Sequence, residues 1–464
     1  MVKSRGWARH KRQLCPLGIA RHLDGTWYGV QKEYEMSEVT RNCSAVREQE
    51  QKAPKRAWAI LAVTYFASIM APMVQFKIPA LASWLFPAYR MDPATFGYLM
   101  SSMSIIGVIL AFPAAFICRK MGLKATVLLS VACLGIGSVW GGSTDSLTIL
   151  MISRMVEGIG IGLIGVAAPA CVAIWFPPQS RGRALGIWAT WVPFGIVLMF
   201  NVAPVIAGTM GFKMVFYLCG VSCLAAFILF AIVFKLPEGE AGNIRLAGSI
   251  GESIKSLKNK YIWILGAVFF IFSFCTLGIA NTFYNTFLVQ VLGFSPQMAG
   301  TITSINMALA FIFAPLSGII SDWLTPNNKR YVVVSMMFFV LISVFLMFVT
   351  GPYAIPCMWA FIIIQGAAGG EGGGAARPIA PLIMGRTAMG ATMAMAVLQF
   401  SQNLGQTFGS PIFGIMLGRY GWMKANLMIE VPMLIVGTIL AFYIRVTAKK
   451  ATREVIAAEP ALAD

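Results

Sequence analysis

The sequence predicts an all-α integral membrane protein whose twelve transmembrane helices form two six-helix bundles. The first observation is composition: the chain has 464 residues, of which 58% are hydrophobic and only 12% are charged, whereas about a quarter of a soluble domain is charged. The second is length: a helix needs about 20 apolar residues to cross the hydrocarbon core, so residues 57–444 accommodate about twelve spans. The third is an internal repeat.

Apolar runs between turn and charge signals give the individual spans. In the first half they are residues 57–82, 94–117, 123–142, 147–173, 183–207 and 213–234. In the second half they are residues 262–288, 297–320, 331–350, 355–383, 389–416 and 423–444.

The repeat relates the two halves. Asp92-Pro93 precedes the second span and Ser295-Pro296 precedes the eighth, and each pair combines an N-cap acceptor with proline at the first helical position. Because each half has six spans, an even number, the halves are parallel repeats.

The predicted organisation is a basic, disordered tail (1–55), a first bundle (56–235), a cytoplasmic linker (236–260), a second bundle (261–445) and a cytoplasmic tail (446–464). Met36 is an alternative translation start.

The net charge of +18 follows from membrane topology. If the N-terminus lies inside, the predicted outer loops contain few basic residues, namely Arg90, Lys213, Arg419 and Lys424, and the inner loops contain many more. The positive-inside rule therefore places both termini in the cytoplasm. We expect a multi-pass protein of the plasma membrane with no nucleic-acid partner.

Several kinds of chemistry are excluded. Both histidines, His10 and His22, lie in the predicted tail, and the nine cysteines include no CxxC pair, so we expect no metal site, no disulfide framework and no cofactor. A GxGxxG pattern at residues 160–165 lies inside an apolar span, where it indicates close helix packing rather than a dinucleotide site. With no convincing nucleophile and base, we expect no enzyme.

Two motifs resemble those of the major facilitator superfamily. Gly318 and Asp322, followed by Lys329 and Arg330, resemble its Gly-xxx-Asp-plus-basic loop, and Arg154 precedes a glycine run (Gly158, Gly160, Gly162) that looks like its RxxxGxGxG pattern. The resemblance covers residues 57–445. It implies secondary transport by two bundles that rock around a central site.

The resemblance also implies a gate. Gly318, Asp322 and Arg330 are the gate candidates, because a carboxylate paired with a cation at the inner helix ends can hold one side shut. The first half has Arg119 where the family has Asp, which leaves the gate mainly to the second half. The alternative is that these residues only anchor the loops in the cytoplasm.

Charged residues inside spans are costly unless they face a cavity or a partner. Arg154 and Glu157 share one helical face, which suits a structural salt bridge or the passage of a substrate or proton. Lys77 lies between Pro72 and Pro79, where a broken helix could expose it to a cavity; the alternative is that it extends to the outer surface. Glu430 is a further charge in the twelfth span.

The tenth span contains Glu371 and Arg377 in a glycine-rich run. The two are about 240° apart around an ideal helix, so each needs its own partner. Arg377 is a candidate anion ligand, with an interhelical pair as the alternative, and Glu371 is a candidate for proton coupling. The glycines permit either very close helix contact or local unwinding.

Polar stripes mark two more spans. In the eleventh, Gln399, Gln402, Asn403 and Gln406 form one helical face, and the seventh has a shorter pattern of Asn281, Tyr284 and Asn285. Such stripes line a water-filled path or join helices. In the family that the chain resembles, the first, fourth, seventh and tenth spans line the central cavity, with parts of the fifth and eleventh.

Together these features favour a monomeric secondary transporter of a small organic solute, most simply an organic anion. Lys77 and Arg377 would bind the anion from opposite halves, the amides would orient it, and Glu371 would carry a coupling proton; solute, proton and lipid bilayer are the expected partners. One alternative is a proton-coupled exporter of cationic or amphipathic compounds with Glu371 as ligand. The other is a non-transporting receptor on the same fold.

Overall fold

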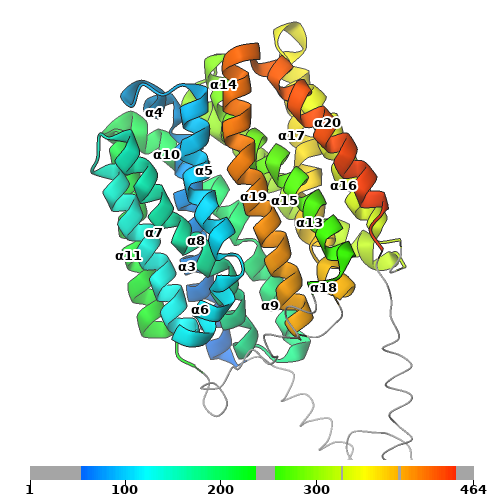
Figure 1. Cartoon of the computed structure of the whole chain (residues 1–464). Coiled ribbons are helices and arrows are strands. Elements are labelled where there is room, and N and C mark those ends of the chain that lie inside the picture. Colours follow the sequence, from blue (N-terminus) through cyan, green and yellow to red (C-terminus); the bar gives the residue numbers. More distant parts are fainter. Residues whose placement is uncertain (1–53, 237–256, 326–327, 385–387, 446–464) are drawn as a thin grey trace, which may run out of the picture.

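The structure is a computed structural model that describes residues 54–236, 257–325, 328–384 and 388–445. Nearly the whole predicted N-terminal tail with Met36, most of the predicted linker and the C-terminal tail lie outside the described residues. Within the described ranges the chain forms helices and no strand. Figure 1 shows most of them running side by side along one direction.

The first half contains six predicted spans, three of them in pieces. The helices are α3 (Lys55–Ala80), α4 (Ala82–Ala88), α5 (Pro93–Leu110), α6 (Pro113–Met121), α7 (Leu123–Gly142), α8 (Leu147–Trp175), α9 (Pro178–Ala189), α10 (Trp191–Met210) and α11 (Phe212–Val233). Pro113 starts α6 and lacks the N–H that would continue α5, so the second span breaks there.

The second half contains two π-helical segments. Its helices are α13 (Lys260–Ser273), η2 (Phe274–Ala280), α14 (Asn281–Gln290), α15 (Pro296–Trp323), α16 (Arg330–Met347), η3 (Gly351–Tyr353), α17 (Ala354–Glu371), η4 (Gly372–Ala376), α18 (Ile379–Met384), α19 (Ala388–Tyr420) and α20 (Trp422–Phe442). The π-helices η2 and η4 interrupt the seventh and tenth predicted spans. The glycines of the tenth span allowed for local unwinding, whereas the sequence did not indicate the interruption of the seventh.

The fold class is confirmed. Eleven helical segments of the described residues are long and apolar enough to cross a membrane, and α19, with 33 residues, occupies the position of the remaining predicted span. Each predicted span coincides with a helix or a broken helix, although the fifth begins earlier than expected, at Pro178.

The predicted helix starts are confirmed in detail. The Asp92 carboxylate accepts a hydrogen bond of 2.8 Å from the Thr95 amide, and hydrogen bonding by the Thr95 side chain and then by its backbone lowers the pKa of this loop carboxyl. The Ser295 hydroxyl oxygen accepts one of 3.3 Å from the Met298 amide. The repeat therefore reflects equivalent capping in the two halves.

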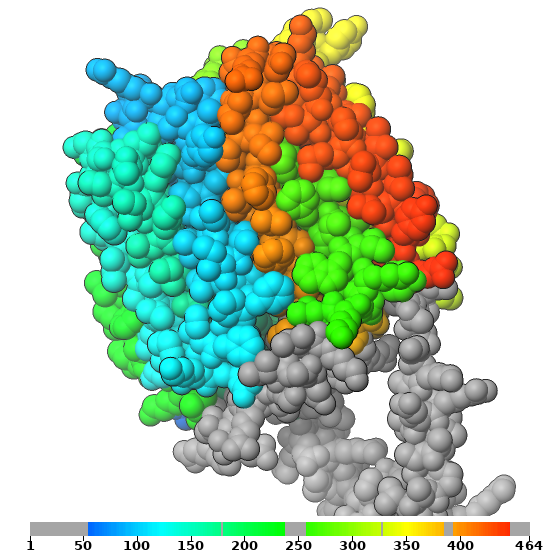
Figure 2. Space-filling view, in the orientation of Figure 1, coloured from blue at the N-terminus to red at the C-terminus, as the bar shows by residue number. Residues whose placement is uncertain are grey.

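The two halves meet along α5 and α19. A side chain at Gly97 would overlap the backbone of Ser410, and the Ser101 hydroxyl donates to the Thr407 carbonyl at 2.6 Å. Figure 2 shows the blue atoms of α5 directly against the orange atoms of α19. At the predicted outer end the Asn285 amide in α14 also donates to the Pro79 carbonyl in α3 at 3.0 Å. The contacts join the halves at that end.

Replacing Asp92 with Ala tests the cap at the start of α5. The variant removes the only side-chain acceptor at this helix start, so we expect a loss of about 1 kcal/mol in the free energy of unfolding. Reversible unfolding in detergent measures the loss. Asp92→Ser, which keeps an acceptor, should stay close to the parent; equal losses in both variants would contradict the capping assignment.

Candidate functional site

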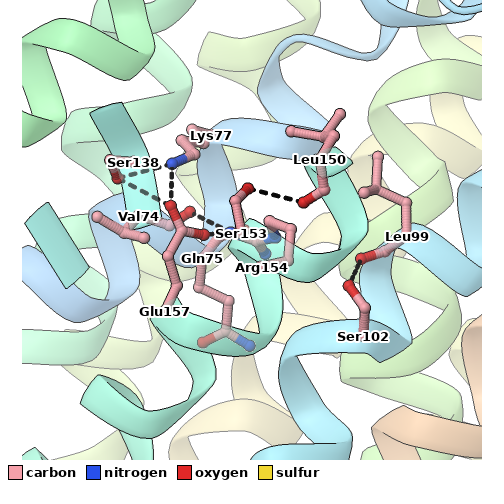
Figure 3. Close-up of polar contacts among 10 residues, drawn as sticks. All are labelled: Val74, Gln75, Lys77, Leu99, Ser102, Ser138, Leu150, Ser153, Arg154 and Glu157. Atoms are coloured by element: carbon pink, nitrogen blue, oxygen red, sulfur yellow. Dashed lines mark hydrogen bonds and ion pairs between the residues drawn. The ribbon is translucent and has the colours of Figure 1, made fainter. Parts of the chain in front are cut away.

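One carboxylate in the first half neutralises two cations. Glu157 Oε1 lies 2.5 Å from Lys77 Nζ, and Oε2 lies 2.5 Å from Arg154 Nη1. Ser138 in α7 completes the cluster, because Lys77 Nζ donates to its hydroxyl oxygen at 2.8 Å. Figure 3 shows the groups converging from α3, α7 and α8. The three charged side chains, called the ion triad below, have no exposed surface.

Arg154 also binds the backbone of α3. Its guanidinium donates to the Val74 carbonyl at 2.8 Å and to the Gln75 carbonyl at 3.2 Å. Pro79 lies four residues after Gln75 and has no N–H, so the Gln75 carbonyl lacks its usual donor within the helix. Arg154 supplies the missing donor, which satisfies a polar group that lipid cannot.

Lys77 is therefore held inside the first half. It does not extend to the outer surface: it is fully buried, and its ammonium group lies 4.4 Å from the centre of the Phe216 ring. Arg154 and Glu157 form the salt bridge that their spacing allows, and a role in the passage of a substrate or proton stays a prediction. The structure does not bring Lys77 together with Arg377.

The two charges of the tenth span have separate partners, as the helical spacing predicted. The Ser335 hydroxyl in α16 lies 3.1 Å from both Glu371 oxygens. Arg377, beyond η4, donates to the Gln402 side-chain oxygen in α19. Both charged side chains are partly exposed, unlike those of the ion triad.

The glycine-rich segment provides both close contact and open space. Cβ atoms at Gly366 and Gly370 would overlap α15, at Leu309 and Phe313, and one at Gly374 would overlap Ala314. Gly373 is exposed, and no heavy atom lies within 4 Å of a Cβ built there. One face of this helix is therefore packed against α15, and the adjacent face at Gly373 has no close neighbour.

The polar stripe of α19 faces other helices and the first half. Gln406 accepts a hydrogen bond of 3.1 Å from the Gln75 side chain in α3. Gln399 donates to Asn403 at 3.3 Å, and Asn403 lies against Gly107 of α5. The stripe thus both joins helices and reaches partly exposed positions, Gln399 and Gln402.

The stripe of α14 lies in a more closed environment. Asn281, Tyr284 and Asn285 are at most 5% exposed. Tyr284 packs its ring 4.4 Å from that of Phe361, and its hydroxyl has no partner among the described residues. Asn285 joins the halves through Pro79. Their role toward a solute stays a prediction.

At the predicted cytoplasmic end, the acidic gate residue pairs differently from the expectation. Asp322 lies 3.4 Å from Lys329, whereas Arg330 donates to the Phe442 carbonyl at 3.4 Å. The pairing of Asp322 with Arg330 is therefore corrected: Arg330 contacts α20, and among the described residues Asp322 forms its ion pair with Lys329. Gly318, Asp322 and Lys329 line a cavity of about 180 Å³ beside η4.

The interpretation of the GxGxxG pattern as close helix packing holds for two of its three glycines. A Cβ at Gly160 would lie 2.6 Å from the Ser130 carbonyl, and one at Gly162 would lie 3.0 Å from Leu110, so both permit close packing. A Cβ built at Gly165 would meet no neighbouring heavy atom within 4 Å, and the residue is exposed. Packing therefore explains the first part of the pattern only.

Sequence reasoning did not single out three polar side chains at this site: Gln75, Ser138 and Ser335. Each is an isolated polar residue in an apolar run, and small hydroxyl residues are common in membrane helices, where they often bond to their own backbone. Gln75 had a usable signal, because a glutamine two residues before a membrane lysine is expensive to bury in lipid without a partner.

Comparison with known proteins is consistent with this geometry. The family model described as Major Facilitator Superfamily matches residues 61–393, which is well over half of the chain. The chain belongs to the major facilitator superfamily. The resemblance in the two motifs is thereby confirmed, and the family consists of transporters rather than enzymes.

Curated relatives of this superfamily member are distant. The Bacillus subtilis hexuronate transporter is 26% identical over 57% of this chain and 61% of its own length. The human sodium-dependent phosphate transport protein 1 is 25% identical over 61% and 66%. The probable sulfoacetate transporter of Cupriavidus necator is 23% identical over 55% and 60%. The chain thus spans roughly three fifths to two thirds of the length of these relatives.

Solved structures share the superfamily fold. A variant of the nucleoside transporter NupG has a TM-score of 0.70 at 14% identity and covers 83% of this chain and 99% of its own. A D-xylose-proton symporter has a TM-score of 0.68 at 18% identity, covering 84% and 98%.

Neutralising Glu157 tests the ion triad. Glu157→Gln leaves two buried cations without a carboxylate, so we expect a loss of about 3–5 kcal/mol in stability. Lys77→Met should cost less, because Glu157 keeps Arg154. Thermal unfolding in detergent compares the two variants, with Ser138→Ala as a mild control. A smaller loss for Glu157→Gln than for Lys77→Met would contradict the shared role of Glu157.

Neighbouring glycines of η4 form a second test. Gly374→Ala forces a methyl group into the Ala314 backbone and should destabilise the protein by about 1–3 kcal/mol. Gly373→Ala meets open space, so its stability should change by less than about 1 kcal/mol. The thermal midpoints of the two variants in detergent decide the matter; equal shifts would be inconsistent with the packing described.

Proposed function

We propose that the protein is a secondary transporter that moves a small organic anion across the plasma membrane by alternating access, with both termini in the cytoplasm. Family membership supports transport. Three relatives are named as transporters of hexuronate, phosphate and sulfoacetate, which supports an anionic substrate. The closed contacts between the halves at the predicted outer end suit one state of such a cycle.

The environment of Arg377 is the main evidence for an anionic substrate. It lies within the tenth span, is partly exposed, and has the neutral Gln402 as side-chain partner. It forms no ion pair with any Asp or Glu in the described ranges. A guanidinium at membrane depth without a counter-ion attracts an anion, and its fork of donors matches a carboxylate or phosphate.

The first half contributes positive charge without direct contact in this state. The ion triad combines two cations with one carboxylate, and in a medium of low dielectric constant its excess positive charge acts over several ångströms. In the proposal, Lys77 and Arg154 favour the anion through this field, Arg377 binds it, and Gln399, Gln402 and Asn403 orient it, with Asn281, Tyr284 and Asn285 behind them.

Glu371 is the proposed proton-coupling residue. The proposed cytoplasmic gate consists of Gly318, Asp322 and Lys329, with Arg330 beside them in contact with α20. The exporter of cationic compounds remains the second candidate on one observation: Glu371 is partly exposed and is bound only by the hydroxyl of Ser335 among the described residues. There Glu371 would bind the cation, and Arg377 would be structural.

Arg377 substitutions distinguish the two functions. For an anion transporter, Arg377→Gln should reduce carboxylate uptake into proteoliposomes by at least about tenfold, because a charge-assisted pair is lost. Arg377→Lys should retain part of it. Radiolabelled or fluorescent-reporter uptake of mono- and dicarboxylates provides the measurement. Unchanged carboxylate uptake in Arg377→Gln, together with loss of cation efflux in Glu371→Gln, would favour the exporter.

A further inference from the structure

We infer that Gln75, rather than Lys77, is the α3 residue that contacts the solute, and that Gln75 and Gln406 together recognise an uncharged oxygen of the transported anion. This inference rests on the proposed function. It names a recognition site for a hydroxyl or carbonyl group, separate from the charge site at Arg377.

Exposure singles out Gln75 on α3. From residue 67 to residue 82 every side chain is buried except that of Gln75. Lys77, two residues later, has no exposed surface. Figure 3 shows the Gln75 side chain directed away from the ammonium group of Lys77. Within this stretch, therefore, only the Gln75 side chain is partly exposed.

The Gln75 side chain is bonded to the other half of the protein. Its Nε2 donates to Gln406 Oε1 in α19 at 3.1 Å, and Gln406 is 2% exposed. The partly exposed Gln75 side chain is therefore bonded across the boundary between the two halves. That is where alternating access places a solute.

The ion triad fixes the position of Gln75. Arg154 binds the backbone carbonyls of Val74 and Gln75, and Lys77 is held by Glu157. The chain around Gln75 is thus bound to α8 through two backbone carbonyls and the Lys77 side chain. The ion triad therefore contributes to the site without touching the solute. It holds the Gln75 amide in one position, and a group held in its binding position binds more tightly.

Unpartnered donors point to a missing acceptor. The Gln406 Nε2 and Asn403 Nδ2 groups are buried and have no hydrogen-bond partner in the described structure, and Asn403 is 6% exposed. Leaving a buried donor unsatisfied costs about 1–3 kcal/mol. An oxygen atom of a solute at this level would satisfy Gln406, which Gln75 already contacts from the other half.

The spacing along α19 sets the size of the solute. Gln402, which contacts Arg377, is one helical turn from Gln406, or about 6 Å along the axis. A carboxylate at Arg377 would therefore place a hydroxyl or carbonyl group a few carbon atoms away beside the two glutamines. The geometry fits a small hydroxylated carboxylate better than a plain alkyl carboxylate of equal length.

Two anions of equal length and charge test the inference. Gluconate and hexanoate each have six carbons and one carboxylate, but only gluconate has hydroxyl groups; glycerate and propionate form a shorter pair. We expect the purified full-length protein to bind each hydroxylated anion more tightly than its alkyl counterpart, as measured by thermal shift and by titration calorimetry. Gln75→Ala and Gln406→Ala should each weaken binding of the hydroxylated anion about tenfold and leave the alkyl anion unchanged.

The double variant separates recognition from simple loss of structure. Because both glutamines act on one group, the loss in Gln75→Ala/Gln406→Ala should be smaller than the sum of the two single losses. Thr438→Ala is the control, because the Thr438 hydroxyl in α20 donates to the Leu434 carbonyl of its own helix and takes no part in the proposed contact. The thermal midpoint without ligand reports whether each variant is folded.

The outcomes are distinct. If the hydroxylated anions bind and depend on Arg377 but not on Gln75 or Gln406, the inference is wrong and the proposed function stands. Equal weakening of hydroxylated and alkyl anions in the glutamine variants also overturns it. If no carboxylate of either pair binds, or Arg377→Gln has no effect on binding, the proposed function fails and the inference fails with it.

Discussion

The Glu157 carboxylate is the group on which the first half of the protein depends. It lies 2.5 Å from cations of two different helices, and all three charges are fully buried. In lipid no water can replace a lost partner. Removal of this one carboxylate would leave Lys77 and Arg154 together without compensation, so α3, α7 and α8 are held in one arrangement by a single acceptor.

In the second half the two charged side chains of the tenth span are bound by neutral groups rather than by each other. Glu371 and Arg377 are separated by η4 and are bound by neutral groups, Ser335 and Gln402. Both remain partly exposed, and the helix that contains them has an open face at Gly373. The first half therefore encloses its charges and provides a rigid frame, whereas the second half leaves its charges available. This asymmetry agrees with the absence of the gate aspartate from the first half.

The contacts between the halves are of a kind that can break. They are close backbone approaches at small residues, such as Gly97 against Ser410, and single hydrogen bonds such as that from Asn285 to Pro79. No ion pair joins the halves within the described residues. A neutral hydrogen bond contributes about 0.5–1.5 kcal/mol net, so such an interface can open at modest cost, as the proposed cycle requires.

The sequence by itself determined the number of spans, the helix starts and the family. These depend on hydropathy over about 20 residues and on caps such as Asp92 with Thr95, which act within a few residues. Tertiary structure alone decided the partners: Glu157, 80 residues away, for Lys77; Lys329 rather than Arg330 for Asp322; and Gln406 for Gln75. The physical reason is that a side chain pairs with whatever helix packing brings within about 3 Å, and packing depends on contacts distant in sequence.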